Sequence, residues 1–99
     1  MDTGIKIIEV PNFGKKVVSV SGKEILLVNF KGKIYAFENE CPHQGSPLTA
    51  AIVKDGSLSC PRHGYRFNLN DGHCAEHPGF VLTTFPVHLD GDAIFVEVD

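Results

Sequence analysis

Apolar and polar residues alternate along most of the chain in short runs, and this two-residue period is typical of β-strands. The pattern predicts strands at residues 5–10, 15–20, 24–30, 33–38, 50–54, 57–59, 66–68, 83–89 and 93–98. Turn-forming pairs separate several of these runs, including Lys31-Gly32, Asp55-Gly56 and Asp71-Gly72. No segment keeps a helical period over about twelve residues. The chain is therefore predicted to be all-β, an antiparallel sandwich or small barrel.

The length of 99 residues suits a single domain with its own core, so we expect one domain over residues 1–99. No apolar run approaches the roughly 18 residues that a membrane span needs. Residues 1–4 do not begin a signal peptide, which would need a basic stretch followed by an apolar one. We therefore expect a soluble, cytoplasmic protein with no membrane partner, and a monomer.

The formal net charge of −3 is unevenly distributed. Residues 1–54 contain seven lysines and five acidic residues, whereas residues 55–99 contain two arginines and seven acidic residues. A mildly acidic chain has no electrostatic basis for binding nucleic acid, so we expect none. The uneven distribution is most simply a property of a solvated surface, although it would also orient a protein partner.

Two short segments carry metal-binding chemistry. Each pairs a cysteine with a histidine, in Cys41-Pro42-His43 and in Cys60-Pro61-Arg62-His63, with sixteen residues between His43 and Cys60. Two sulfur and two nitrogen ligands suit either tetrahedral zinc or a two-iron cluster in which two histidines replace two cysteines. Zinc fingers usually pair cysteine with cysteine and histidine with histidine. The mixed pairs therefore favour the two-iron centre.

At these two segments the sequence resembles the Rieske-type 2Fe–2S ferredoxin family. Residues 41–45 look like the first cluster loop of the family, and residues 60–65 look like the second. The resemblance implies one cluster per chain, with Cys41 and Cys60 on the inner iron and His43 and His63 on the outer iron. It also implies a basal β domain that carries a small inserted cluster-binding subdomain, here approximately residues 39–70.

Other positions place the chain within that family. High-potential members have a disulfide between the cluster loops, with cysteines where this chain has Ser46 and Arg62, and a serine where it has Tyr65. The chain therefore resembles the ferredoxin branch, and we expect a reduction potential of about −150 mV, the low end of the Rieske range. Pro42 and Pro61 are expected to stiffen the two loops.

The resemblance implies a non-enzymatic one-electron carrier that passes electrons from a reductase to a terminal oxygenase, as a component of a dioxygenase or related system. One alternative is the small subunit of an NADH-dependent nitrite reductase. An alternative of a different class is a structural zinc-binding interaction module.

The remaining candidates are predicted to be structural. Cys74 occupies a position suited to a small apolar strand residue, and we expect it to pack rather than to bind metal. His73, His77 and His88 are expected to be surface residues or satisfied polar residues, not ligands. Pro78-Gly79 resembles the proline-containing loop that covers the cluster in this family. We expect aromatic residues to fill the core or shield the cluster: Phe67, Phe80 and Phe85.

Overall fold

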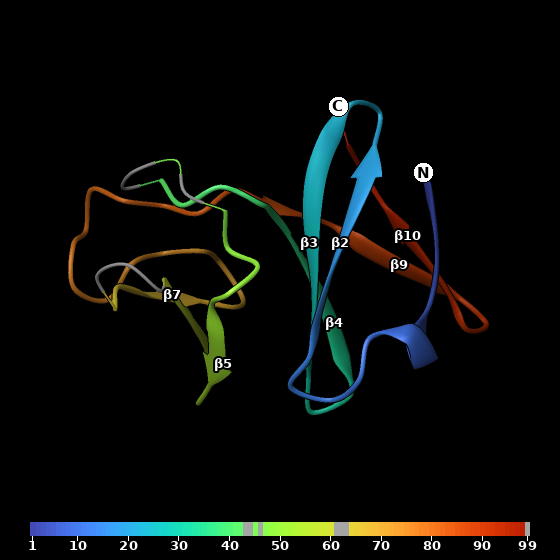
Figure 1. The fold of residues 1–99 in the computed structure, drawn as a ribbon, viewed down its shortest axis with the longest axis horizontal. Helices are drawn as coiled ribbons and strands as arrows, with labels where there is room; N and C mark the ends of the chain where they lie inside the picture. Colours follow the sequence, from blue (N-terminus) through green and yellow to red (C-terminus); the bar gives the residue numbers. More distant parts are fainter. Residues whose placement is uncertain (43–44, 46, 61–63, 99) are drawn as a thin grey trace.

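The computed structural model describes residues 1–42, 45, 47–60 and 64–98, and shows an all-β fold in which every strand pair is antiparallel (Figure 1). The elements are β1 (Asp2–Lys6), a short 3-10 helix η1 (Ile7–Glu9), β2 (Lys15–Val20), β3 (Lys23–Phe30), β4 (Lys33–Glu38), β5 (Ile52–Lys54), β6 (Ser57–Ser59), β7 (Arg66–Asn68), β8 (Thr84–Phe85), β9 (Val87–Asp90) and β10 (Ala93–Val96). They form three sheets with strand orders β1-β10-β9, β2-β3-β4-β8 and β5-β6-β7. The predicted fold class is confirmed.

Strand β3 is buried on both faces and connects two hydrophobic cores. Ile25 and Leu27 point into one core, while Leu26 and Val28 point into the other, because successive side chains of a strand face opposite sides. All four side chains are fully buried. This explains why β3 has a nearly continuous apolar run instead of the alternation seen in half-buried strands.

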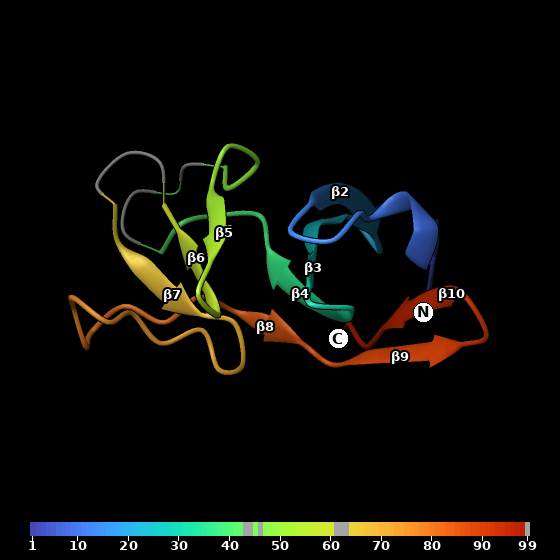
Figure 2. The same ribbon diagram turned by 90° about the horizontal axis from the view of Figure 1, so that it is seen from below.

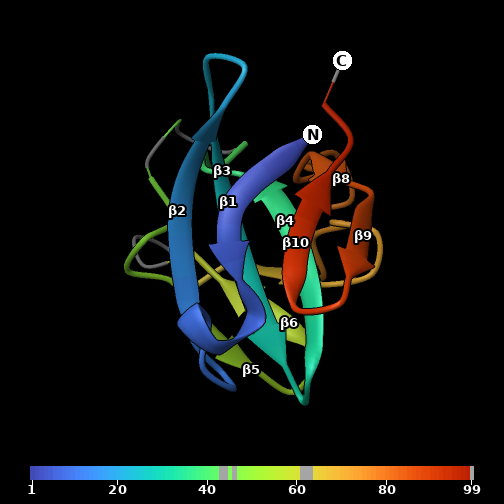
Figure 3. The ribbon, with the colours of Figure 1, turned by 90° about the vertical axis from the view of Figure 1, so that its right-hand side faces the viewer.

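The first core lies between the β1-β10-β9 sheet and the β2-β3-β4-β8 sheet. Figure 3 shows β1 and β10 in front of β3 and β4, and residues of both sheets share one core, so the two sheets form a sandwich. Val20 from β2, Ile34 from β4, and Ile94 and Val96 from β10 are buried between them. Burial of this apolar area is the main force that holds the sandwich together.

The second core joins the opposite face of β3 and β4 to the β5-β6-β7 sheet. Phe37 from β4 packs in the same cluster as Val53, Leu58 and Phe67, one from each of the three short strands. Figure 2 shows β5, β6 and β7 at one end of the molecule, and β9 and β10 at the other. The predicted division into a basal domain and an inserted subdomain at residues 39–70 stays a prediction, although this small sheet lies within that range.

Two of the predicted strands are interrupted or cut short by side chains of their own sequence. The strand expected at residues 5–10 ends at Lys6, because the Glu9 carboxylate accepts a hydrogen bond from the Lys6 N–H at 2.9 Å and the chain turns into η1. The strand expected at 83–89 is split into β8 and β9 at Pro86, which has no N–H to donate to a ladder. There the chain passes from one sheet to the other.

The hairpin turns follow the sequence closely. Lys31-Gly32 and Asp55-Gly56 form two-residue turns with positive φ at both positions, which is the type I′ geometry. The strand expected at 50–54 begins two residues later, because the Ala51 N–H donates to the Leu48 carbonyl in a turn. In the described part of the chain no helix is long and apolar enough to cross a membrane.

Candidate metal centre

The carbonyls of Cys41 and Cys60 each accept a hydrogen bond from the glycine four residues later, which closes a turn at each cysteine. The Gly45 N–H donates to the Cys41 carbonyl at 2.7 Å, and the Gly64 N–H donates to the Cys60 carbonyl at 2.9 Å. Both glycines have φ near +70°, at +72° and +69°, a conformation that other residues adopt at a cost. The sequence pattern of cysteine followed by glycine four residues later therefore encodes two equivalent turns.

The two cysteines are buried in the same core. Cys41 is 1% exposed and Cys60 is 2% exposed, and both belong to the cluster that contains Leu48 and Leu58. The Cys60 N–H also donates to the Tyr65 carbonyl at 2.7 Å, which closes the second turn from both sides. Two thiols held in matched turns over one apolar core fit a shared metal centre, since water is excluded from behind the sulfur ligands.

Asn39 fixes the segment that carries the first turn. Its side chain is 8% exposed, and its Oδ1 accepts a hydrogen bond from the buried Leu48 N–H at 2.8 Å. Its Nδ2 donates to Glu24 Oε1 at 3.1 Å, and its backbone N–H donates to the Glu24 carbonyl at 3.0 Å. Asn39 thus ties both ends of the segment around Cys41 to strand β3.

A third segment, residues 75–80, is bonded to the strand that follows the second turn. The Arg66 N–H donates to Glu76 Oε1 at 2.8 Å, and Arg66 Nε donates to Glu76 Oε2 at 2.6 Å. The Ala75 N–H donates to the Arg66 carbonyl at 2.9 Å. The backbone N–H of Arg66, and then its guanidinium, hold the pKa of Glu76 below its usual value. These bonds fix the third segment beside the Cys60 turn.

Aromatic rings join the third segment to the second turn. The rings of Tyr65 and Phe80 are 6.0 Å apart, and the His77 ring stacks on Phe80 at 4.2 Å. Phe80 is half-buried and packs against the core that contains both cysteines. The predicted covering loop at Pro78-Gly79 therefore lies in a segment held by these rings.

Carboxylates surround the first turn. A hollow of about 510 Å³ is lined by Glu24, Glu38 and Glu40 together with Lys23, Asn39, Gly45 and Pro47. A side chain placed at Gly45 would begin 3.2 Å from Glu40 Oε1, so this carboxylate lies directly beside the turn. Negative charge near a redox centre disfavours the gain of an electron.

The predicted site residues fall into two groups. Cys41 and Cys60 are placed together, as described above, while His43 and His63 lie outside the described residues. Within residues 1–42, 45, 47–60 and 64–98 no group of three or more metal-ligating side chains occurs. The four-ligand assignment therefore stays a prediction.

Cys74 packs in the core, as expected, and its having no part in metal binding stays a prediction. Cys74 is 6% exposed and pairs with Phe67 in an isolated β-bridge, inside the second core. The other three histidines lie at the surface, as predicted. The His73 ring lies 3.2 Å from the Asp71 carboxylate, and the backbone N–H of His73 lowers the pKa of that carboxyl. The His88 ring lies 3.1 Å from the Glu97 carboxylate. Phe67 is fully buried.

Sequence reasoning missed two residues that position the site. Asn39 and Glu76 act through partners nine and ten residues away, Leu48 and Arg66. A polar residue next to a cysteine motif gives no signal of such a partner. The repeated cysteine-to-glycine spacing was the one local signal, and it marked the two turns.

Comparison with known proteins identifies the family. The model of the Rieske [2Fe-2S] domain matches residues 5–86. The naphthalene 1,2-dioxygenase system ferredoxin component of Pseudomonas aeruginosa is 27% identical over 95 residues, covering 95% of this chain and 91% of that protein. Apoptosis-inducing factor 3 of Homo sapiens is 30% identical over 89 residues, which are 89% of this chain but 15% of that longer protein.

Solved structures share the fold. The ferredoxin of carbazole 1,9a-dioxygenase from Nocardioides aromaticivorans superimposes with a TM-score of 0.87 at 22% identity, covering 97% of this chain and 94% of that one. This chain belongs to the Rieske [2Fe-2S] domain family. The cofactor is accordingly a Rieske 2Fe–2S cluster, and the zinc alternative is set aside.

Proposed function

We propose that this chain is a one-electron carrier of the Rieske ferredoxin type, which passes electrons from a reductase to a terminal oxygenase. The observation that carries the proposal is the pair of buried cysteines in matched turns, in a chain of the Rieske family. The naphthalene relative, named as a ferredoxin component, supports this role because its match covers 91% of that protein.

Four residues hold the cluster in this proposal. Cys41 and Cys60 would hold the inner iron, and His43 and His63 would hold the outer iron. When bound, the cluster supplies a single-electron redox step. The chain itself fixes the first turn through Asn39, and supports the second turn through the Arg66–Glu76 ion pair and the Tyr65–Phe80 contact.

The reduction potential is proposed to be low, about −150 mV. The carboxylates beside the first turn, Glu24, Glu38 and Glu40, add negative charge that disfavours reduction. The sequence has no second pair of cysteines for a disulfide between the loops, and Tyr65 stands where high-potential relatives have a serine. Voltammetry checks this value; a midpoint far above zero would contradict it.

Partners dock over the end of the molecule that carries the two turns, since electron transfer needs a short distance to the outer iron. Transient redox encounters use small interfaces, and charged residues at their rim change association rates. The carrier is proposed to work as a cytoplasmic monomer. Arg62, beside His63 in the sequence, provides the test: Arg62→Glu keeps the spectrum but alters the salt dependence of electron transfer.

Alanine variants of the four ligands test the cluster assignment. Each of Cys41→Ala, His43→Ala, Cys60→Ala and His63→Ala abolishes the Rieske-type electron paramagnetic resonance signal of the reduced protein, while Cys74→Ser, the matched control, retains it. Loss of the signal in Cys74→Ser overturns the assignment. Iron and acid-labile sulfide are measured in the same samples.

Reconstitution tests the carrier role separately. The reduced protein is mixed with an oxygenase component, and cluster reoxidation is followed by absorbance in a stopped-flow instrument. Reoxidation that depends on the oxygenase supports the proposal. Reoxidation by a nitrite reductase large subunit, with none by an oxygenase, would favour the nitrite reductase alternative.

A further inference from the structure

A hollow of about 640 Å³ lies between the β3–β4 turn and the β5–β6 turn. Its lining combines aromatic, aliphatic and charged side chains: Phe13, Phe30, Lys31, Val53, Lys54, Asp55 and Gly56. The Phe13 ring packs edge-on against Phe30 with centroids 5.4 Å apart, yet Phe13 remains 50% exposed. A volume of this size falls within the range of ligand-binding pockets, about 300–1,000 Å³.

Phe13 is held in an unfavourable backbone conformation. Its φ is +64°, and among the described non-glycine residues with positive φ it is the one outside a two-residue hairpin turn. The Phe13 N–H donates to the Asn29 carbonyl at 2.7 Å, and Asn12 Oδ1 accepts from the Lys31 N–H at 2.7 Å. These bonds impose the conformation that presents the aromatic ring to solvent, and strain of this kind concentrates at functional sites.

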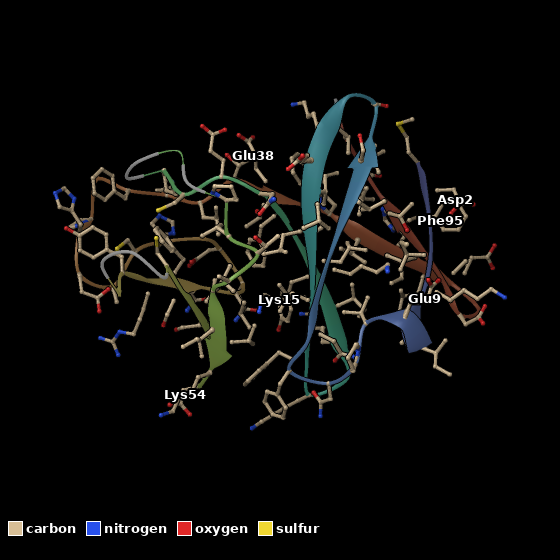
Figure 4. All side chains as sticks on the ribbon, in the orientation of Figure 1. Asp2, Glu9, Lys15, Glu38, Lys54 and Phe95 are labelled. Carbon is tan, nitrogen blue, oxygen red and sulfur yellow. The ribbon has the colours of Figure 1, made fainter. Side chains whose placement is uncertain are left out.

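Positive charge gathers along the same part of the molecule. A second hollow, of about 260 Å³, is lined by Lys15, Lys16, Val17, Leu26 and Thr49. Figure 4 shows Lys15 on β2 and Lys54 at the end of β5, both in the lower half of the view. The two hollows together contain four of the seven lysines and one carboxylate, although the chain has a net charge of −3.

We propose that this surface, defined by Phe13, Phe30, Lys31 and Lys54, binds an acidic segment of a partner protein that carries an aromatic side chain. The aromatic side chain packs against Phe13 and Phe30, where aromatic pairs favour offset or edge-on contact. The carboxylates of the segment pair with Lys31 and Lys54, and charge complementarity selects an acidic partner.

A short peptide provides the direct test. The probe is fluorescein-labelled Asp-Glu-Phe-Glu-Asp, and its binding to the cluster-loaded protein is followed by fluorescence anisotropy at low salt. Two control probes test the aromatic contact and the charge separately. The first is the same peptide with alanine in place of phenylalanine, and the second is the basic peptide Lys-Arg-Phe-Arg-Lys. The wild-type protein binds the first probe, binds the alanine peptide about tenfold more weakly and does not bind the basic one.

Variants of the protein locate the site. Phe13→Asn removes the ring but introduces a residue that tolerates positive φ, and it weakens binding of the peptide about tenfold. Phe13→Tyr keeps an aromatic ring and binds the peptide as wild type does. Lys54→Glu weakens binding about fivefold, while the matched charge reversal Lys6→Glu, on β1, leaves it unchanged. The cluster spectrum is recorded for every variant, because an unchanged spectrum shows that the fold is intact.

Three results overturn the proposal. The first is equal binding of the probe by wild type and Phe13→Asn. The second is equal loss in Lys54→Glu and Lys6→Glu, which would indicate a nonspecific effect of net charge. The third is tighter binding of a labelled single-stranded oligonucleotide than of the acidic peptide, which would make the surface a nucleic-acid site instead.

Discussion

Gly72 is the position where adding one methyl group should disturb the structure most. A Cβ built at Gly72 would lie 2.0 Å from the Leu82 carbonyl oxygen and 3.0 Å from its carbon. These are backbone atoms, so they cannot rotate away as a side chain would. Gly56 offers a matched control, because its φ of +76° nearly equals the +77° of Gly72 while nothing lies within 4 Å of its would-be Cβ.

Both alanine variants lose free energy of unfolding from the backbone conformation, and Gly72→Ala loses more from a steric clash. Both place a side chain in the left-handed region, which costs about 1–2 kcal/mol, partly offset by a stiffer unfolded chain. In Gly72→Ala the segments must also separate, which breaks the bond from the buried Leu82 N–H to the Gly72 carbonyl at 2.8 Å. A buried group left unpaired costs about 1–3 kcal/mol, and displaced core packing adds to this. We expect totals of about 1 kcal/mol for Gly56→Ala and about 4 kcal/mol for Gly72→Ala.

Urea unfolding of the cluster-loaded protein, followed by far-ultraviolet circular dichroism under anaerobic conditions, measures the difference. With a denaturant slope of about 1.5 kcal/mol per molar, the midpoint of Gly72→Ala falls about 2 M below that of Gly56→Ala. Equal midpoints for the two variants would refute the reasoning, because the backbone angle would then account for the whole effect. An altered slope would mean that the variant changes the unfolding transition itself.

Three further predictions concern the polar groups around the turns. Asn39→Ala leaves the buried Leu48 N–H without its acceptor and lowers the free energy of unfolding by about 2 kcal/mol; the urea midpoint measures the loss, and a midpoint equal to that of wild type would contradict it. Glu40→Gln removes a carboxylate beside Gly45 and raises the reduction potential by an amount on the order of tens of millivolts, with Glu9→Gln as the control; voltammetry that gives equal shifts would contradict a local effect. The pKa of Glu76 is lowered in the folded state, so its stabilising contribution is present above the usual value of 4.5 and is lost as the pH falls through the lowered pKa. The urea midpoint of Glu76→Gln is therefore below that of wild type at neutral pH and converges with it in acid; a constant gap would show that charge is not involved.

Local patterns in the sequence were sufficient for most of the strands. The hairpins at Lys31-Gly32 and Asp55-Gly56 were predictable because a two-residue turn depends on the residues in the turn itself. The break at Pro86 was not predicted, because the change of sheet there depends on which partner strands are near, and alternation does not reveal them. The 3-10 helix was missed because it depends on a hydrogen bond that a single side chain, the Glu9 carboxylate, accepts from the Lys6 N–H.

The same distinction between local signals and contacts made only in the folded chain applies to the site. Its cysteines could be predicted because metal ligands need particular residue types at particular spacings. The residues that position the site could not be predicted, because Asn39 and Glu76 are ordinary polar residues whose hydrogen-bond partners are set by the folded chain. The surface around Phe13 has no sequence signature, since it combines side chains from three separate turns.

The two-sided burial of β3 has a consequence for the lifetime of the protein. A strand that belongs to both cores cannot leave one without disrupting the other, so the chain unfolds as one cooperative unit rather than in halves. A metal centre bound at one end therefore contributes its binding free energy to the stability of strands at the far end. When iron is scarce, the unfolded fraction of the whole chain rises, and proteolytic turnover removes carrier molecules that hold no cluster.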